Sequence, residues 1–501
     1  MLRNAFTRDR PDQPSAPARS RHPGFLIAAL CTAGIGVSLM QTLMIPVIPD
    51  LPQLLDTSAD NASWAITATL LVAAVATPVF GRLGDMYGPQ RVLVVSALVL
   101  TAGAVVAATS HSLLPLIIGR GLQGFGMPII PLGISVLRAS VPADRVGSAM
   151  GMMSSSLGVG GALGLPLGAV IAENLDWHAL FWFATGLGVI CVAVFVTMVP
   201  HVPASSRDRF DPLGAVLLAA GLVCLLLPIS KGGAWGWTSP TTLVLFGSAA
   251  VVLVLFGLWQ LRYPSPIVDL RTTVRLPVLT TNVASIGVGV SLYGISLVAP
   301  QILELPKETG YGLGQSVLHA GLWMAPGGLA MMVASNIAAR VAARRGPKFT
   351  LVLGCLIVAA GYLTGFVLLR SAVGVLAMNV VVSVGVGFAF SSLPALINSA
   401  VPMSETAAAN GINSLARALG TSLSSAVIGA ILGGMTMNFA GHQVPTETGL
   451  HVALGFVTGA AVVAALLALL IPKAPAPAAE PALALRDRSG PSTPWSGNVR
   501  R

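Results

Sequence analysis

The strongest constraint on this chain is the number of long apolar runs that it contains. A helix that crosses a lipid bilayer needs about 20 mostly apolar residues. Hydrophobic residues make up 54% of the chain and charged residues only 9%, whereas a soluble domain carries roughly 25% charge. We therefore expect an all-α membrane protein with about fourteen transmembrane helices. The apolar runs lie at 24–45, 62–80, 92–109, 113–137, 146–172, 179–199, 213–229, 241–261, 278–303, 313–339, 349–369, 373–401, 406–435 and 450–471.

Basic residues are distributed unequally between the two sides of these predicted helices. With the N-terminus inside, 23 of the 28 Lys and Arg residues fall in inside segments, and only Lys231, Lys307 and Arg370 fall in outside loops. Cytoplasmic loops are enriched in Lys and Arg, so we predict that both termini are cytoplasmic. Arg120 and Arg417 lie within predicted helices, and we expect Arg417 to extend to the cytoplasmic surface. The net charge of +10 thus reflects topology and does not indicate a nucleic-acid partner.

The chain carries an internal repeat. Segment 81–90 resembles segment 339–348 at an offset of 258 residues, and the Val-Pro pair at 141–142 recurs at 401–402 at an offset of 260. Two six-helix halves in tandem, with the runs 213–229 and 241–261 inserted between them, explain these offsets. Such repeats place a substrate cavity between the halves, near the bilayer midplane. The predicted divisions are a disordered cytoplasmic tail (1–23), a six-helix bundle (24–200), two inserted transmembrane helices with their loops (201–276), a second six-helix bundle (277–472) and a disordered cytoplasmic tail (473–501).

A charged, glycine-rich segment joins the second and third predicted helices and reads GRLGDMYGPQR from 81 to 91. Glycine permits a tight turn and close approach of helix ends. We expect Asp85 near the start of the third helix, where the positive end of the helix dipole favours a carboxylate. A pair between Asp85 and an arginine that forms in only one conformation would act as a gate. The alternative is a plain charged loop that sets topology. The candidate gate residues are Gly81, Arg82, Asp85, Gly88 and Arg91.

Arg120 lies inside the predicted helix 113–137. A charge within a membrane helix costs about 2.5–3.5 kcal/mol on insertion scales, so such a residue is a functional candidate by default. Gln123 lies one turn further along the same helix face and is a natural hydrogen-bond partner. The alternative is a structural arginine whose guanidinium is satisfied by backbone carbonyls.

Two motifs resemble those of the major facilitator superfamily. Segment 81–91 resembles its loop motif G-x-L-a-D-r-x-G-r-k, with departures at Met86, Pro89 and Gln90. Segment 116–126, LIIGRGLQGFG, resembles its motif L-x-x-x-R-x-x-Q-G-x-G. The inserted helix pair, SWAIT at 63–67 and DPLG at 211–214 look like the fourteen-helix drug:proton antiporter branch. The resemblance covers about residues 24–472. It implies the major facilitator fold, secondary transport by alternating access, and a role for Arg120 in proton transfer.

A third segment, GGALGLPLGA at 160–169, resembles the antiporter motif G-x-x-x-G-P-x-x-G-G of the fifth helix. The proline is displaced by one residue and the last glycine is alanine, so the match is partial. Small residues in such a stripe allow close packing and sliding of helices. The residues that carry the resemblance are Gly160, Gly164, Pro166 and Gly168.

The branch usually carries an aspartate in its first helix, but the stretch SLMQTLMIP at 38–46 has none and holds Gln41 instead. No carboxylate lies deep in any predicted helix. Buried acids commonly bind cations and relay protons, so we expect a neutral, zwitterionic or anionic lipophilic substrate. His319 is a candidate because histidine is the side chain best suited to proton transfer near neutral pH, and Glu173 lies at the outer end of the fifth helix. A structural histidine and a solvated helix end are the alternatives. The candidates for proton relay or substrate contact are Arg120, Gln123, Gln41, Glu173 and His319.

The sequence favours proton-coupled export of lipophilic drugs or metabolites. A proton-independent facilitator or exporter of a neutral, anionic or lipid-like metabolite is the alternative, and a membrane receptor or enzyme is a third class. Phosphate-loop, nucleophile-elbow and metal-spaced histidine motifs are missing, so we predict no enzyme activity, metal or cofactor. The expected partners are the substrate, protons and the bilayer, for a monomer in a bacterial plasma (inner) membrane. Candidate cavity residues, each also explicable as packing or an interfacial anchor, are Trp64, Tyr293, Trp323 and Met324.

Overall fold

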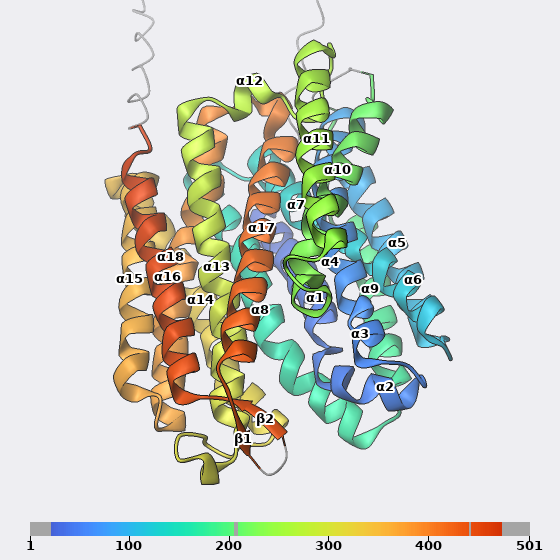
Figure 1. Ribbon diagram of the computed structural model, residues 1–501. Helices are drawn as coiled ribbons and strands as arrows, with labels where there is room; N and C mark the ends of the chain where they lie inside the picture. Colours follow the sequence, from blue (N-terminus) through green and yellow to red (C-terminus); the bar gives the residue numbers. More distant parts are fainter. Residues whose placement is uncertain (1–21, 205–208, 440–441, 473–501) are drawn as a thin grey trace, which may run out of the picture.

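The computed structural model describes residues 22–204, 209–439 and 442–472. Within them fourteen helices are long and apolar enough to cross a membrane, which confirms the predicted number of spans. The two described chain ends, near Pro23 and Leu469, lie at the same end of the molecule, as an even number of spans requires (Figure 1). We call this end the terminal face. The other end, which carries a β-hairpin, we call the hairpin face. Both predicted tails lie outside the described residues, apart from 22–23.

The N-terminal bundle forms six spans. Two of them are interrupted. The first helix continues into a 3₁₀ turn, and the fourth is divided by the glycine-rich turn 124–126, where glycine weakens a helix. The elements are α1 (Pro23–Thr42), η1 (Ile45–Asp50), α2 (Leu51–Leu54), α3 (Ala59–Ala62), α4 (Trp64–Tyr87), α5 (Pro89–Ala108), α6 (Leu113–Gln123), η2 (Gly124–Gly126), α7 (Ile129–Ser140), α8 (Ala143–Asn174) and α9 (His178–Thr197).

The C-terminal bundle also forms six spans, and two further spans precede it. The inserted spans and their connector are α10 (Pro212–Trp235), α11 (Pro240–Arg262) and α12 (Leu270–Thr273). The C-terminal elements are α13 (Leu276–Glu304), η3 (Lys307–Thr309), α14 (Val317–Arg345), α15 (Pro347–Leu368), α16 (Ala372–Ala400), η4 (Met403–Glu405), α17 (Thr406–Gly434), β1 (Thr436–Phe439), β2 (His442–Pro445) and α18 (Glu447–Leu469).

Each bundle has its own apolar core. Buried side chains between Leu26 and Val199 pack together in the first, and those between Ala284 and Ile471 pack together in the second. Ala407, at the start of α17, is the exception, since it packs into the core of the first bundle. The fold is therefore two six-helix bundles plus two inserted helices, as predicted.

The inserted helix α10 seals one seam between the bundles. Its buried Leu218, Leu222 and Leu226 pack in one cluster with Ala74 of α4 and Leu415 of α17. In Figure 1, α10 and α11 lie together beside α4 and α17. The inserted pair thus contacts both bundles.

Asp211 orders the start of this inserted pair. Its carboxylate accepts hydrogen bonds from the backbone N–H of Gly214 at 2.8 Å, from Trp259 Nε1 at 3.0 and 3.1 Å, and from Gln260 Nε2 at 2.8 Å. The first bond caps α10, and the others tie α10 to α11. Gln260 Oε1 in turn accepts from the backbone N–H of Val268, which anchors the connector to α13. The segment DPLG is therefore a structural clamp.

Two features differ from the sequence predictions. Lys231 was expected in an outside loop but lies inside α10, only 2% exposed, with its Nζ 2.5 Å from Ser63 Oγ and 4.9 Å from the ring centre of Trp64. Neighbouring polar and aromatic groups on α4 lower the cost of burying this ammonium. The second difference is the antiparallel hairpin β1–β2, which follows α17 directly and which an all-α prediction omits.

Candidate functional site: a gate and two buried arginines

The motif 81–91 is mostly helical. Residues up to Tyr87 form the last turns of α4, Gly88 breaks the helix with φ of 92°, and α5 begins at Pro89. A positive φ at this position suits glycine, because a side chain would be strained there. The segment is therefore not the loop that was predicted, and Asp85 lies at the end of α4 instead of the start of α5.

Asp85 reaches across to the other bundle. Its carboxylate, 1% exposed, accepts hydrogen bonds from the backbone N–H groups of Ala407 at 3.1 Å and Ala408 at 2.9 Å. These groups form the first turn of α17, where a helix presents unsatisfied N–H donors and a positive dipole end. The expected attraction between Asp85 and a helix N-terminus thus exists, but the helix is α17 of the opposite bundle.

The glycines of the motif make this approach possible. A Cβ added at Gly81 would lie 2.8 Å from the carbonyl oxygen of Ala407, closer than real Cβ contacts. A Cβ at Gly84 would collide with Leu132 of α7. Arg82 is 7% exposed beside this contact, whereas Arg91 is exposed on α5. Gly81, Arg82 and Asp85 are therefore at the junction of the bundles, and Arg91 is outside it.

Arg138 of α7 completes the contact and was missed by the sequence reasoning. Its Nη1 donates to Thr406 Oγ1 at 2.5 Å, and its Nη2 donates to the carbonyl oxygens of Asn398 at 2.7 Å and Val401 at 3.4 Å. These carbonyls end α16, the negative end of a helix dipole. Asp85 and Arg138 thus place opposite charges on the facing ends of α17 and α16. We call this pair of contacts the latch. Its sequence signal was weak, because Arg138 looks like any loop arginine.

The second seam between the bundles, formed by α8 and α14, lacks such a charge pair. At the terminal face Ser148 Oγ donates to Asn336 Oδ1 at 2.7 Å. Further along the seam a Cβ at Gly321 would lie 2.8 Å from the backbone nitrogen of Pro166. Ala343 stands at the repeat position of Asp85. The two seams are therefore chemically different, although the bundles are repeats.

Arg120 is buried between three helices of the first bundle. It is 2% exposed, and its Nη1 donates to Gln123 Oε1 at 2.7 Å and to the carbonyl oxygen of Met40 on α1 at 3.4 Å. Its Nε donates to the carbonyl oxygen of Ala65 on α4 at 3.2 Å. The amide nitrogens of Gln41 and Gln123 have no hydrogen-bond partner among the described residues. The guanidinium of Arg120 is therefore held by neutral acceptors, and these two amide nitrogens are available to donate hydrogen bonds.

Arg417 is likewise buried, in the second bundle, and its predicted extension to the surface is wrong. It is 6% exposed, its Nη1 donates to Asn413 Oδ1 at 2.6 Å, and its guanidinium lies 5.1 Å from the ring centre of Phe390. Asn413 Nδ2 continues the network to Asn282 Oδ1 at 3.0 Å and Ser285 Oγ at 2.7 Å. A dense neutral network satisfies the charge in place, so the side chain does not extend to the surface.

The glycine stripe of the antiporter-like motif packs within one bundle. Cβ atoms at Gly160 and Gly164 would collide with α1, and one at Gly168 would collide with Leu43, directly after α1. Pro166 lies on a different face of α8, against α14 of the other bundle. The stripe therefore explains the close α1–α8 packing, whereas contacts between bundles use other residues of α8.

The remaining candidates are spread over the molecule. Glu173 and His319 are exposed at the hairpin face, and His319 Nδ1 lies 2.8 Å from Ser316 Oγ. Trp64 packs beside Lys231 of α10. Glu173 and His319 make no hydrogen bond with Arg120 among the described residues, whereas Trp64 adjoins Ala65, whose carbonyl oxygen accepts from Arg120 Nε. Among the described residues, no three His, Cys, Asp or Glu side chains gather as a metal site would require. The other candidates are Trp323, whose Nε1 donates to Gln315 Oε1, Met324, which is buried on α14, and Tyr293, which is half-buried on α13.

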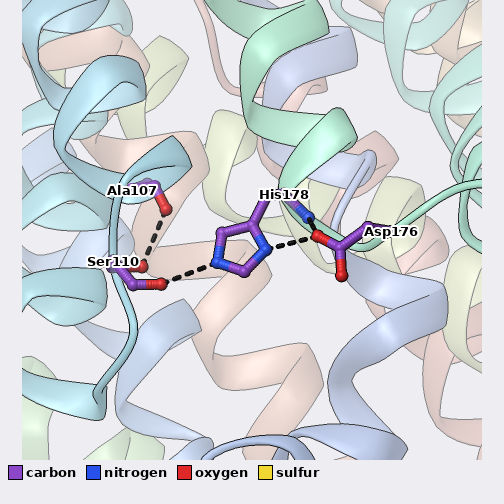
Figure 2. Close-up of polar contacts among 4 residues, drawn as sticks. All are labelled: Ala107, Ser110, Asp176 and His178. Atoms are coloured by element: carbon purple, nitrogen blue, oxygen red, sulfur yellow. Dashed lines mark hydrogen bonds and ion pairs between the residues drawn. The ribbon is translucent and has the colours of Figure 1, made fainter.

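A histidine clip at the hairpin face was also missed (Figure 2). His178 Nε2 contacts the carbonyl oxygen of Ser110 at 2.8 Å, and its Nδ1 contacts Asp176 Oδ1. The carboxylate oxygen of Asp176 and the carbonyl oxygen of Ser110 thus face the two ring nitrogens of His178 from opposite sides. Hydrogen bonds from the backbone and side chain of His178 lower the pKa of Asp176. The clip joins the loop after α5 to the loop before α9.

The two bundles, the inserted pair and a charged latch at one seam are the features of a polytopic membrane transporter. The family model of the Major Facilitator Superfamily matches residues 30–425, and the chain belongs to this superfamily. The fourteen spans among its described residues fit the fourteen-helix branch. The chain is a transporter by family and fold, and not an enzyme.

Relatives support this assignment. The tetracenomycin C resistance and export protein of Streptomyces glaucescens is 26% identical over 84% of this chain and 79% of its own length. The lincomycin resistance protein LmrB of Listeria monocytogenes is 25% identical over 81% of this chain and 86% of its own length. The solved structure of the proton:xylose symporter XylE has a TM-score of 0.63 at 14% identity, covering 90% of this chain and 96% of that one. The human organic anion transporter MFSD10 has a TM-score of 0.60 at 15% identity, covering 90% and 100%. These two structures establish the fold alone.

Proposed function

We propose that this protein exports lipophilic small molecules by alternating access, driven by protons, with the latch as its cytoplasmic gate. The observation that carries the proposal is the Asp85 carboxylate bound to the first turn of α17 in the opposite bundle. A contact between two rigid bodies at one end of a central seam must break when that end opens. The latch would therefore close the terminal face while substrate leaves at the hairpin face.

We also propose that the terminal face is cytoplasmic. The helix ends and connectors at this face carry Arg91, Arg145, Arg271 and the basic group 340–348, whereas those described at the hairpin face carry Lys307 and Arg370. Basic residues concentrate in cytoplasmic loops. We retain the predicted domain divisions, with a monomer in a bacterial plasma membrane as the expected state.

Export of a drug or metabolite is supported by what the relatives are named for. Two of them are named for resistance to, or export of, an antibiotic, and a third, from Bacillus subtilis, is named multidrug resistance protein 3 and is 25% identical over 81% of this chain. A lipophilic substrate fits the chemistry of the spans. Every carboxylate in the described spans lies within two residues of a span's end, so none of these spans carries an acid near the middle of the bilayer that could bind an organic cation.

Proton coupling rests on Arg120 and Gln123. A guanidinium held only by neutral acceptors can bind an anionic or acceptor-rich group. It can release that group when the charge of the group or of its surroundings changes. The absence of a deep carboxylate in the described spans favours a second candidate, a proton-independent facilitator with the same gate. The two candidates differ in whether substrate flux and proton flux are coupled.

The test uses everted vesicles from an overexpressing strain. Lipophilic compounds are added while the internal pH is recorded, and export is followed with and without an uncoupler. Coupled export should alkalinise the lumen and stop with the uncoupler. Export that continues unchanged with the uncoupler would support the facilitator, and no export of any compound by wild-type protein would refute both. Vesicles that contain Asp85→Asn serve as the control for gate-dependent flux.

A further inference from the structure

We propose that a groove at the hairpin face, between α13, α17 and β1–β2, is a binding subsite for an uncharged amphipathic molecule. Only the biological role of this subsite rests on the proposed export function: the substrate would bind there last before its release from the protein. Its existence and its chemistry are independent of proton coupling.

The groove has the size and surface of a ligand site. Its volume is about 560 Å³, within the range of roughly 300–1,000 Å³ that is typical of small-molecule pockets. None of the described residues that line it carries a charge. Its buried or half-buried apolar side chains form a floor, and exposed side chains with amide and hydroxyl groups form a rim. The floor residues are Leu297, Ile428 and Leu432, and the rim residues are Gln301, Thr436 and Gln443.

The groove lies on the face of α17 that is turned toward the first bundle. Gly411 and Gly429 are 18 residues apart, or five helical turns at 3.6 residues per turn, so they point in the same direction. At Gly411 a Cβ would lie 3.0 Å from the carbonyl oxygen of Thr77 on α4. At Gly429 and Gly433 a Cβ would meet nothing within 4 Å. This face of α17 is thus packed against α4 in its terminal half and uncovered at Gly429 in its hairpin half, where the groove lies.

The lining selects for a neutral ligand. Leu297, Ile428 and Leu432 offer apolar surface, so a flat or aliphatic group gains by leaving water. The amides of Gln301 and Gln443 can each donate and accept, so a carbonyl, hydroxyl or amine can bind at the rim. A sulfonate or ammonium would lose hydration without gaining an opposite charge.

Glycine allows the groove to be filled without disturbing the backbone. Gly429→Leu and Gly433→Leu each add a side chain into open space on α17, and leucine is a better helix former than glycine. Gly455→Leu is the matched control, because a Cβ at Gly455 on α18 also meets nothing within 4 Å and this residue does not line the groove. Size-exclusion profiles and melting temperatures verify that the variants fold.

The probes are N-phenyl-naphthylamine, which is neutral, and its sulfonated counterpart anilinonaphthalene sulfonate. Fluorescence titrations use the full-length protein in phosphatidylcholine nanodiscs, with empty nanodiscs subtracted. We expect saturable binding of the neutral dye, at least about tenfold weaker binding of the sulfonated dye, and at least about tenfold weaker neutral-dye binding in both filled variants, where tenfold corresponds to about 1.4 kcal/mol. Gly455→Leu should bind like wild type.

Three results would overturn the subsite: no saturable binding of the neutral dye to wild type, equal binding of the two dyes, or unchanged binding in both filled variants. Because the titration requires no transport, it separates the two proposals. Binding that is lost in the filled variants, together with no export by wild type, would retain the subsite and reject the export function.

Discussion

Replacing Asp85 with asparagine tests the latch most directly. The carboxylate accepts two backbone hydrogen bonds from the first turn of α17, at 3.1 and 2.9 Å. Asparagine has nearly the same shape but only one acceptor oxygen, so one of the two N–H groups loses its partner. The substitution also removes the negative charge from the positive end of the α17 dipole.

The size of the effect follows from these losses. A buried donor without a partner costs about 1–3 kcal/mol, and a partly buried charge at a helix terminus contributes up to about 2 kcal/mol. Burying the carboxylate costs several kcal/mol and offsets part of this gain. We expect the closed state to weaken by about 1–3 kcal/mol, which is about a 5- to 150-fold shift toward the open state.

The assay is the distribution of distances between spin labels on the two bundles at the terminal face. Tyr87 and Met403 are suitable positions, because they are 53% and 51% exposed. Asp85→Asn should add a longer distance and reduce export while leaving insertion intact. Asp144→Asn is the control, since this carboxylate is 75% exposed and only faces Arg145 at 3.8 Å. An unchanged distribution in Asp85→Asn, or an equal change in the control, would refute the latch.

Substitutions at four further residues have defined outcomes. Arg138→Gln should also open the terminal face. In the double variant with Asp85→Asn, the free energy of opening, taken from the spin-label populations, should differ from the sum of the two single effects by at least about 0.5 kcal/mol. Simple additivity would argue against a shared latch. Arg120→Ala should abolish export at normal protein level. Arg120→Lys should retain little export, because an ammonium lacks the forked donors of a guanidinium. Full export by the alanine variant would leave Arg120 only a structural role. Lys231→Met should destabilise the α10–α4 contact by about 1–2 kcal/mol, seen as a lower melting temperature, and an unchanged value would contradict the contact. Asp176→Asn should lower the melting temperature above about pH 4, the unfolded-state range of an aspartate. That difference should disappear as the pH falls through the lowered pKa of Asp176, and a difference that persists in acid would exclude the ionised clip.

The sequence predicted the architecture well because bilayer physics is local. Twenty apolar residues in a row satisfy their backbone hydrogen bonds only as a helix in lipid, so run length alone revealed the fourteen spans. The repeat offset revealed the two bundles and the inserted pair. Lys231 and Arg417 were misplaced for one common reason: a charge can remain within a span when polar neighbours from other helices satisfy it, and the sequence does not show which helices are neighbours.

The latch shows most clearly what the sequence predicted and what it did not. The motif at 81–91 singled out Asp85, but the sequence assigned its carboxylate to the dipole of the next helix along the chain. Only the tertiary structure identified the dipole that it meets as the one of α17, more than 300 residues away in the sequence. Arg138 had no distinguishing local pattern and acquired its role by facing the end of α16. Hydrophobicity and charge bias act on each segment independently, so the sequence by itself determined the spans and their number. Contacts between helix ends depend on how the two bundles meet, so only the tertiary structure decided which residues form the latch.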